Sequence, residues 1–182
     1  MTRSLLVVAV GVGVAGADVP WTNHSGDATF FTWENGGSVN GLYGDPTLVG
    51  GNAFVFFPDH FRAEAVDGGQ QTTNDTFYVD LIARPGQSIT GVRIQEFGDY
   101  GIEVGGSVDL AAELSATNLN GGGGEIDTMT TDLNFPVQTS GEGSYMGTAE
   151  VEILAGGWQR VRMEFSNNLI AIADAGGTAF IQ

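Results

Sequence analysis

Short runs of β-forming residues, each with one apolar side, recur along this chain between glycine-rich turns. In residues 75–83, the side chains of Phe77, Val79 and Leu81 fall on one side of an extended chain. Residues 159–166 alternate in the same way. Successive side chains of a strand point to opposite sides, so a period of two with one apolar side predicts half-buried antiparallel strands.

Several segments alternate in this way. Only residues 109–117 could hold a helical apolar stripe for three turns after residue 17, and their neighbours favour a strand. Strands are expected at 28–33, 53–57, 61–66, 75–83, 88–97, 106–119, 126–137, 147–155, 159–166, 169–175 and 178–182. Many short strands without helices to cover them predict an all-β fold, an antiparallel two-sheet sandwich of a jelly-roll-like kind.

The turns between these strands carry their own signals. Residues 83–88 read ARPGQS, in which Pro85 presets φ and Gly86 tolerates a positive φ, so a tight turn is expected there. Residues 120–125, NGGGGE, are expected to form a flexible loop. Neither an internal repeat nor a second domain is indicated.

The first 17 residues differ from the rest. Arg3 precedes an apolar run over residues 5–14, and Ala15 and Ala17 complete a small-residue cleavage site. This order is typical of a secretory signal peptide. The run is shorter than the about 20 apolar residues that span a bilayer. We therefore expect a signal peptide over 1–17, a single β-sandwich domain over 18–182, secretion or display at the cell surface, and no membrane span after cleavage.

Charge and cysteine content narrow the functional classes. The chain carries 22 acidic and 6 basic residues, for a net charge of −16. Such a surface repels nucleic acids and anionic lipids, which bind through Lys and Arg. Such a surface could also attract divalent cations, but solubility outside the cell is the preferred explanation of the charge. The absence of cysteine excludes disulfides, thiol chemistry, Cys₄ zinc sites and iron–sulfur clusters.

Residues 94–100, IQEFGDY, bring Glu96 and Asp99 within three positions of each other. Glu96 falls on the apolar side of its strand and Phe97 on the other, while Gly98 and Asp99 resemble the turn that ends the strand. A catalytic pair of carboxylates requires a separation of about 5–10 Å across a cleft. We therefore expect a strand end here, with Glu96 bonded to backbone at the sheet edge, and we assign no catalytic residue.

A second acidic segment begins like the E-x-D-x-x-E signature of sandwich-fold glycoside hydrolases of the laminarinase-like family. Glu125 and Asp127 match its first two carboxylates, but Met129 and Thr130 occupy the two places available for the third. Retaining hydrolysis requires that proton donor. We therefore expect no enzyme of this type.

Other catalytic and metal-binding signals are weak. His24 and His60 are the only histidines, and two isolated histidines without a third ligand do not define a zinc site. The G-x-S-x-G elbow of hydrolases is absent, because residues 140–144 have Glu142 at the nucleophile position.

Two segments expected to be loops, 67–75 and 40–46, gather oxygen side chains of the kind that calcium prefers. Neither has the spacing of a known calcium loop. The sequence predicts no cofactor and leaves open whether these loops hold a structural calcium ion or only make turns.

Aromatic residues suggest a surface on which sugars could stack, although in β proteins such residues more often build the core. The residues considered are Trp21, Trp33, Trp158, Tyr43, Tyr78, Tyr100 and Tyr145. We expect most of them in the core.

Part of the chain resembles secreted bacterial proteins of the PEP-CTERM, exosortase-sorted kind. In that family a D-T-F-x-V strand leads through A-x-P-G-x-x-I to I-x-E-x-G-D-Y, matched here by residues 75–79, 83–89 and 94–100. Residues 167–182 are also similar. The resemblance covers roughly half the chain, and its motifs are structural and moderately specific.

The resemblance implies an exported β-sandwich protein of the envelope or extracellular matrix, without established catalytic residues. The family ends in a Pro-Glu-Pro motif, an apolar helix and a basic tail, whereas the sequence here stops at Gln182. Either the chain continues, or the protein is released or held by other contacts.

The sequence as a whole therefore predicts a non-enzymatic structural protein of the extracellular matrix or cell surface. One alternative is a module that binds extracellular polysaccharide. A second is a filament subunit, in which the terminal strand at 178–182 adds to the open sheet edge of another copy. The expected partners are polysaccharide or copies of the protein itself.

Overall fold

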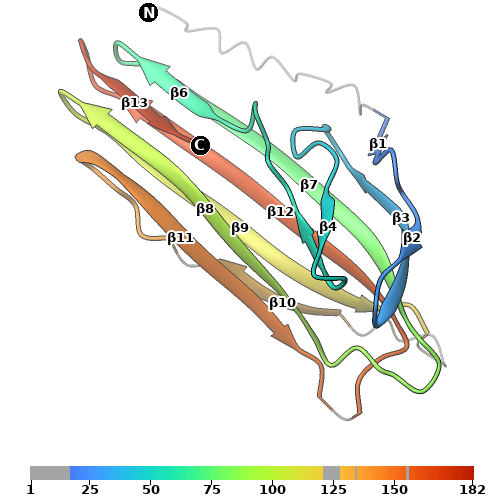
Figure 1. Cartoon of the computed structure of the whole chain (residues 1–182). Coiled ribbons are helices and arrows are strands. Elements are labelled where there is room, and N and C mark those ends of the chain that lie inside the picture. The colour runs from blue at the N-terminus through green and yellow to red at the C-terminus, as the bar shows by residue number, and fades with distance from the viewer. Residues whose placement is uncertain (1–16, 121–127, 134, 155) are drawn as a thin grey trace, which may run out of the picture.

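A computed structural model describes residues 17–120, 128–133, 135–154 and 156–182. These residues form β-strands and contain no helix, so none that could cross a membrane (Figure 1). The strands are β1 (Val19–Pro20), β2 (Gly26–Asp27), β3 (Phe31–Ser38), β4 (Thr47–Val49), β5 (Ala53–Val55), β6 (Ala63–Val66), β7 (Gln70–Ala83), β8 (Gly91–Glu103), β9 (Gly106–Asn118), β10 (Thr128–Leu133), β11 (Gly141–Glu152), β12 (Arg160–Ala173) and β13 (Thr178–Ile181).

The strands from β6 to β13 build a two-sheet sandwich. One sheet has the order β11-β8-β13-β6, and the other contains β7-β12-β9-β10, extended beyond β7 by β3, β1 and β2. Every pair is antiparallel. The chain passes from one sheet to the other at each step except the β9–β10 hairpin, which is the jelly-roll arrangement. The predicted antiparallel sandwich is confirmed.

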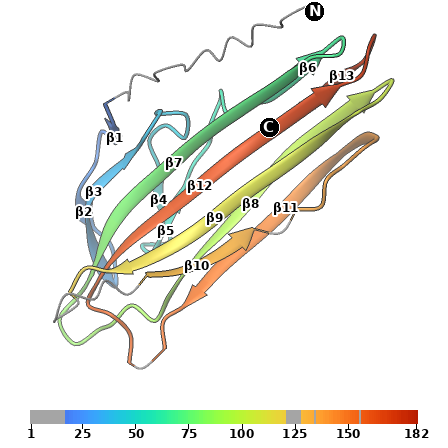
Figure 2. The same cartoon turned by 180° about the vertical axis from the view of Figure 1, so that it is seen from behind.

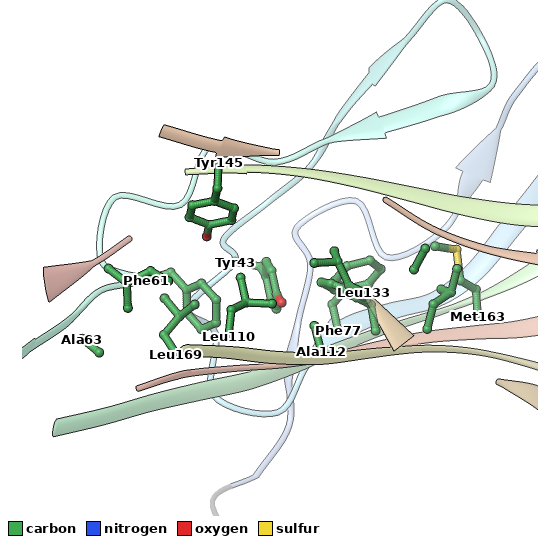
Figure 3. Close-up of a cluster of buried hydrophobic side chains, with 14 of the residues drawn as sticks. Tyr43, Phe61, Ala63, Phe77, Leu110, Ala112, Leu133, Tyr145, Met163 and Leu169 are labelled. Carbon is green, nitrogen blue, oxygen red and sulfur yellow. The ribbon is translucent and has the colours of Figure 1, made fainter. Parts of the chain in front are cut away.

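Side chains that point between the sheets form one hydrophobic core (Figure 3). The alternation predicted for its two central strands is confirmed, because the buried residues include Phe77, Val79, Leu81, Val161, Met163 and Phe165. Burying each side chain of this size stabilises the fold by about 1.5–3 kcal/mol. Most of the polar residues of these strands lie on the opposite sides.

Aromatic rings fill the part of the core that lies under the β4–β5 hairpin. Figure 1 shows this hairpin over the seven-stranded sheet, beyond the short strands β6 and β13. The ring of Trp21 lies 5.5 Å from that of Phe54 and 5.6 Å from that of Phe56. Phe56 in turn lies 4.8 Å from Phe77 of β7. The hairpin therefore completes the core where the four-stranded sheet ends.

The predicted turn at 83–88 is present after β7. The N–H of Gln87 donates to the carbonyl of Arg84 at 2.9 Å, and Gly86 has a φ of 82°. Proline followed by a glycine with positive φ is the sequence that a type II turn requires.

The loop predicted for residues 67–75 is wrong, because β7 already begins at Gln70. Its polar start is explained by bonds to the neighbouring strand. The Gln71 side chain accepts from the N–H of Glu64 at 3.0 Å, and the Thr73 hydroxyl donates to the carbonyl of Arg62 at 2.7 Å. Polar residues that hydrogen-bond the backbone of an edge strand resemble a loop when only the sequence is considered.

The prediction of separate strands at 159–166 and 169–175 is also wrong, since β12 is one strand of 14 residues. The sequence break at Asn167 and Asn168 does not interrupt it. The Asn167 side chain points inward and is 2% exposed, so a polar residue occupies an apolar position of the repeat.

The C-terminal strand β13 lies inside its sheet, hydrogen-bonded to β6 on one side and β8 on the other. Ala179 and Ile181 are fully buried. The strand proposed for transfer to another copy therefore belongs to the core of its own chain. The loop expected at 120–125 falls almost entirely outside the described residues.

Candidate functional site: a buried carboxylate between the sheets

β8 does not end near Gly98, as the sequence suggested, but continues to Glu103. A side chain at Gly98 would collide with the carbonyl of Gln182 and the ring of Tyr145. Glycine is therefore used here for close packing within a strand. The strand ends at Glu103, just before Val104 with its positive φ of 70°. The expectation of a strand end at Glu96 is therefore wrong.

Glu96 and Asp99 do not form a pair. They are an odd number of residues apart on one strand, so their side chains point to opposite sides. Glu96 lies on the inner side with Val92, which is buried, whereas Asp99 is exposed on the outer side. Phe97 is also on the outer side, as predicted.

Glu96 hydrogen-bonds across the sandwich. Its Oε1 accepts from the Tyr145 hydroxyl at 3.3 Å and from Nδ2 of Asn167 at 2.5 Å. Tyr145 belongs to β11 of the same sheet, but Asn167 belongs to β12 of the opposite sheet. Figure 3 shows Tyr145 directed from its strand into the space between the layers. One carboxylate thus links the two layers.

Several polar atoms around Glu96 are buried without a hydrogen-bond partner among the described residues. They are Oε2 of Glu96, Oδ1 of Asn167 and the hydroxyl of Tyr43. Burial raises the pKa of Glu96 from 4.5 to about 7, although the hydrogen bonds from Asn167 and Tyr145 act in the opposite direction. Burial, reinforced by the charge of Glu96, raises the pKa of Tyr145 and Tyr43 above the usual range, so both phenols keep their protons.

This arrangement supplies a carboxyl group that titrates near neutral pH. General acid–base catalysis also requires a substrate atom within hydrogen-bond reach. Two depressions on the described surface, one of about 500 Å³ at the ends of β8 and β11 and one of about 240 Å³ beside Trp21, are lined by other residues. Glu96 lines neither depression and instead contacts side chains of the two sheets, Tyr145 and Asn167.

The carboxylates of the two candidate calcium loops bond to the chain itself. Asp75 accepts from the N–H groups of Asn40, Leu42 and Thr76 at 2.7–2.8 Å. Asp45 accepts from the N–H and hydroxyl of Thr22. Within the part of the chain that the structure describes, no three His, Cys, Asp or Glu side chains are grouped to hold a metal ion. The alternative that these loops hold a calcium ion stays open.

The remaining candidate residues are not brought together. His24 and His60 are exposed in separate loops, and Glu142 is exposed on β11. Glu125 and Asp127 lie outside the described residues. Met129 and Thr130 are exposed on β10.

The aromatic residues considered as a sugar platform are mostly in the core, as expected. Trp21, Tyr43 and Tyr145 are buried, and Trp33, Tyr100 and Trp158 pack against the core. Tyr78 alone lies on an outer face, where its hydroxyl donates to Asp18 at 2.9 Å. These seven residues therefore do not share one exposed surface.

An ionic cluster on the outer face of the seven-stranded sheet was not predicted. Asp80 of β7 is 2% exposed and accepts from Nε of Arg162 at 2.6 Å and from Nδ2 of Asn35 at 2.9 Å. Arg160 bonds both Asp80 and Glu34. Burial alone would raise the pKa of Asp80, but these hydrogen bonds outweigh it and lower the pKa. The alternation of Arg160 and Arg162 with apolar residues in β12 could have indicated a cationic outer face that needs acidic partners.

Neither protein-family models nor curated proteins give a match to this chain.

Proposed function

We propose that the protein is a non-enzymatic structural component of the cell exterior, secreted or held at the cell surface. The observation that carries the proposal is the position of Glu96. This carboxylate, one of those considered from the sequence as a catalytic candidate, bonds Tyr145 and Asn167 and links the two sheets. A carboxylate enclosed between the two sheets favours a structural role over a catalytic one.

Location outside the cell is supported by the sequence. Residues 1–17 have the order of a signal peptide. The resemblance to PEP-CTERM proteins, carried by residues 75–79, 83–89 and 94–100, favours the same compartment.

The surface supports a role in contact rather than turnover. With 22 acidic and 6 basic residues, most carboxylates have no basic partner in the chain. The salt bridges use Arg62, Arg84, Arg160 and Arg162. Many exposed carboxylates allow weak multivalent contact with cations and, through cations, with other acidic polymers of a matrix.

Genetic complementation tests the proposal. The gene is deleted in the producing organism, matrix cohesion is measured, and the gene is restored as wild type or with Glu96→Gln. A structural role predicts that both restore cohesion equally, with the protein recovered outside the cell. An enzyme that uses Glu96 as acid or base would lose function in the variant, and retention inside the cell would exclude an exterior role.

Polysaccharide binding is a second candidate because of one exposed pair. Phe97 is 68% exposed and lies directly across from Met146, which is 63% exposed, on the outer face of the four-stranded sheet. A flat apolar surface beside polar side chains suits stacking on a sugar ring. Retarded migration in gels that contain the matrix polysaccharide would favour this function.

A further inference from the structure

The two edges of the four-stranded sheet differ. The short edge strand β6 is partly covered, since the Gln71 side chain bonds its outward N–H at Glu64 and the Thr73 hydroxyl bonds the carbonyl of Arg62 just before it. The other edge is β11, a strand of 12 residues whose pairing with β8 is continuous and without a bulge. Figures 1 and 2 both show β11 at the margin of the molecule.

The outward backbone groups of β11 can be assigned. The N–H of Ile153, one residue beyond β11, donates to the carbonyl of Thr90 at 2.9 Å. Residues of an antiparallel strand alternate between bonding the neighbour on one side and facing the other side. The odd-numbered residues therefore bond β8, and the N–H and C=O groups that face outward belong to Glu142, Ser144, Met146, Thr148, Glu150 and Glu152. They have no backbone partner in the described part of the chain.

We propose that β11 pairs antiparallel with β11 of a second copy about a two-fold axis. The four-stranded sheets of two copies would then form one continuous sheet across the interface. An antiparallel edge is complementary to itself under two-fold symmetry, so a second copy supplies the matching row of donors and acceptors. Exposed edges of this length template pairing unless charge or proline interrupts them.

The side chains on β11 fit this occupant. Residues 143–149 carry no charge. Pairing Ser144 with Met146 of the second copy sets Glu142 opposite Thr148, so no carboxylates face each other directly. The exposed Met146 and Phe97 lie beside the axis, and both copies bury apolar surface there.

This pairing rests on the proposed structural role and names one contact through which copies would assemble. Its test uses the purified protein, so the result does not depend on where the protein is located in the cell. Two chains of net charge −16 repel each other. Salt screens this repulsion, and pairing is therefore expected to strengthen as ionic strength rises.

Sedimentation velocity of the purified protein over a range of concentrations and salt tests the proposal. Thr148→Pro removes an outward N–H while leaving the bonds to β8 intact, and Thr148→Ala is its matched control. We expect wild type and Thr148→Ala to dimerise and Thr148→Pro to dimerise at least about tenfold more weakly. Thermal unfolding verifies that each variant is folded.

Met146→Glu provides a second test that does not alter the backbone, because it adds a carboxylate beside the axis in each copy. It is expected to weaken the dimer, most strongly at low salt. Dimers that persist in both Thr148→Pro and Met146→Glu would overturn the proposed interface. A wild-type protein that stays monomeric at about 0.1 mM in high salt would also overturn it.

Discussion

At the scale of single residues, the sequence predicted sides of strands better than their ends. Period two placed Glu96 inward and Phe97 outward, and both positions are confirmed. The strand end was wrong because glycine and aspartate are common in turns, while Gly98 here makes room for Tyr145. The hydrogen bond from Asn167 to Glu96 joins residues 71 positions apart, and no local pattern reports such a contact.

Gly98→Ala tests the close packing of β8. Its Cβ would collide with the Gln182 carbonyl and the Tyr145 ring, so we expect a loss of about 1–3 kcal/mol in the free energy of unfolding. Urea denaturation measures the loss. Gly143→Ala on the paired strand is the control. The nearest neighbour of its Cβ would be the Tyr100 side chain at 3.2 Å, which can shift slightly to make room. Equal effects of the two substitutions would contradict this explanation.

At the scale of elements, β7 and β12 were predicted too short because both contain polar residues. β7 begins with polar residues that bond β6, and β12 contains Asn167 at an inward position. Propensity and periodicity treat such residues as breaks, because the partners that satisfy them are on other strands. β9, whose buried positions are all apolar, was predicted at 106–119 and is observed at Gly106–Asn118.

The segment that connects β3 to β4 depends on one carboxylate of β7. Asp75 accepts from the N–H groups of Asn40, Leu42 and Thr76 and is 2% exposed. Asp75→Ala leaves these donors without an acceptor, and we expect the free energy of unfolding to fall by about 3 kcal/mol. Asp75→Asn keeps one acceptor oxygen and should lose less. Thermal unfolding of both variants gives the comparison, and a loss below about 1 kcal/mol for Asp75→Ala would show that water replaces the carboxylate.

At the scale of the whole molecule, strand composition predicted the sandwich but not the order of strands in each sheet. That order is fixed by pairs far apart in sequence, such as β13 with β6 and β7 with β12. Turn chemistry locates hairpins such as β9–β10, whereas crossings between sheets leave no local signal. The site was incompletely predicted for the same reason, since its members come from β8, β11, β12 and the loop with Tyr43.

The net charge of −16 predicts a dependence of stability on salt. Repulsion among unpaired carboxylates destabilises the compact state, and salt screens it. We expect the unfolding temperature to rise by a few degrees between about 10 mM and 0.5 M sodium chloride. A melting temperature that falls with salt would show that the salt bridges of Arg160 and Arg162 outweigh the repulsion.

The central claim is that Glu96 is enclosed between the two sheets and links them. The most direct test is the free energy of unfolding of wild type and Glu96→Gln between pH 4 and 8, with the exposed Glu150→Gln as control. The folded carboxyl keeps its proton up to a pKa of about 7, whereas the unfolded one loses it near 4.5. Wild type should therefore lose about 3 kcal/mol relative to Glu96→Gln as the pH rises through this window, and no more above it. A difference between the two proteins that stays constant with pH would mean that Glu96 is open to water, and would contradict the claim.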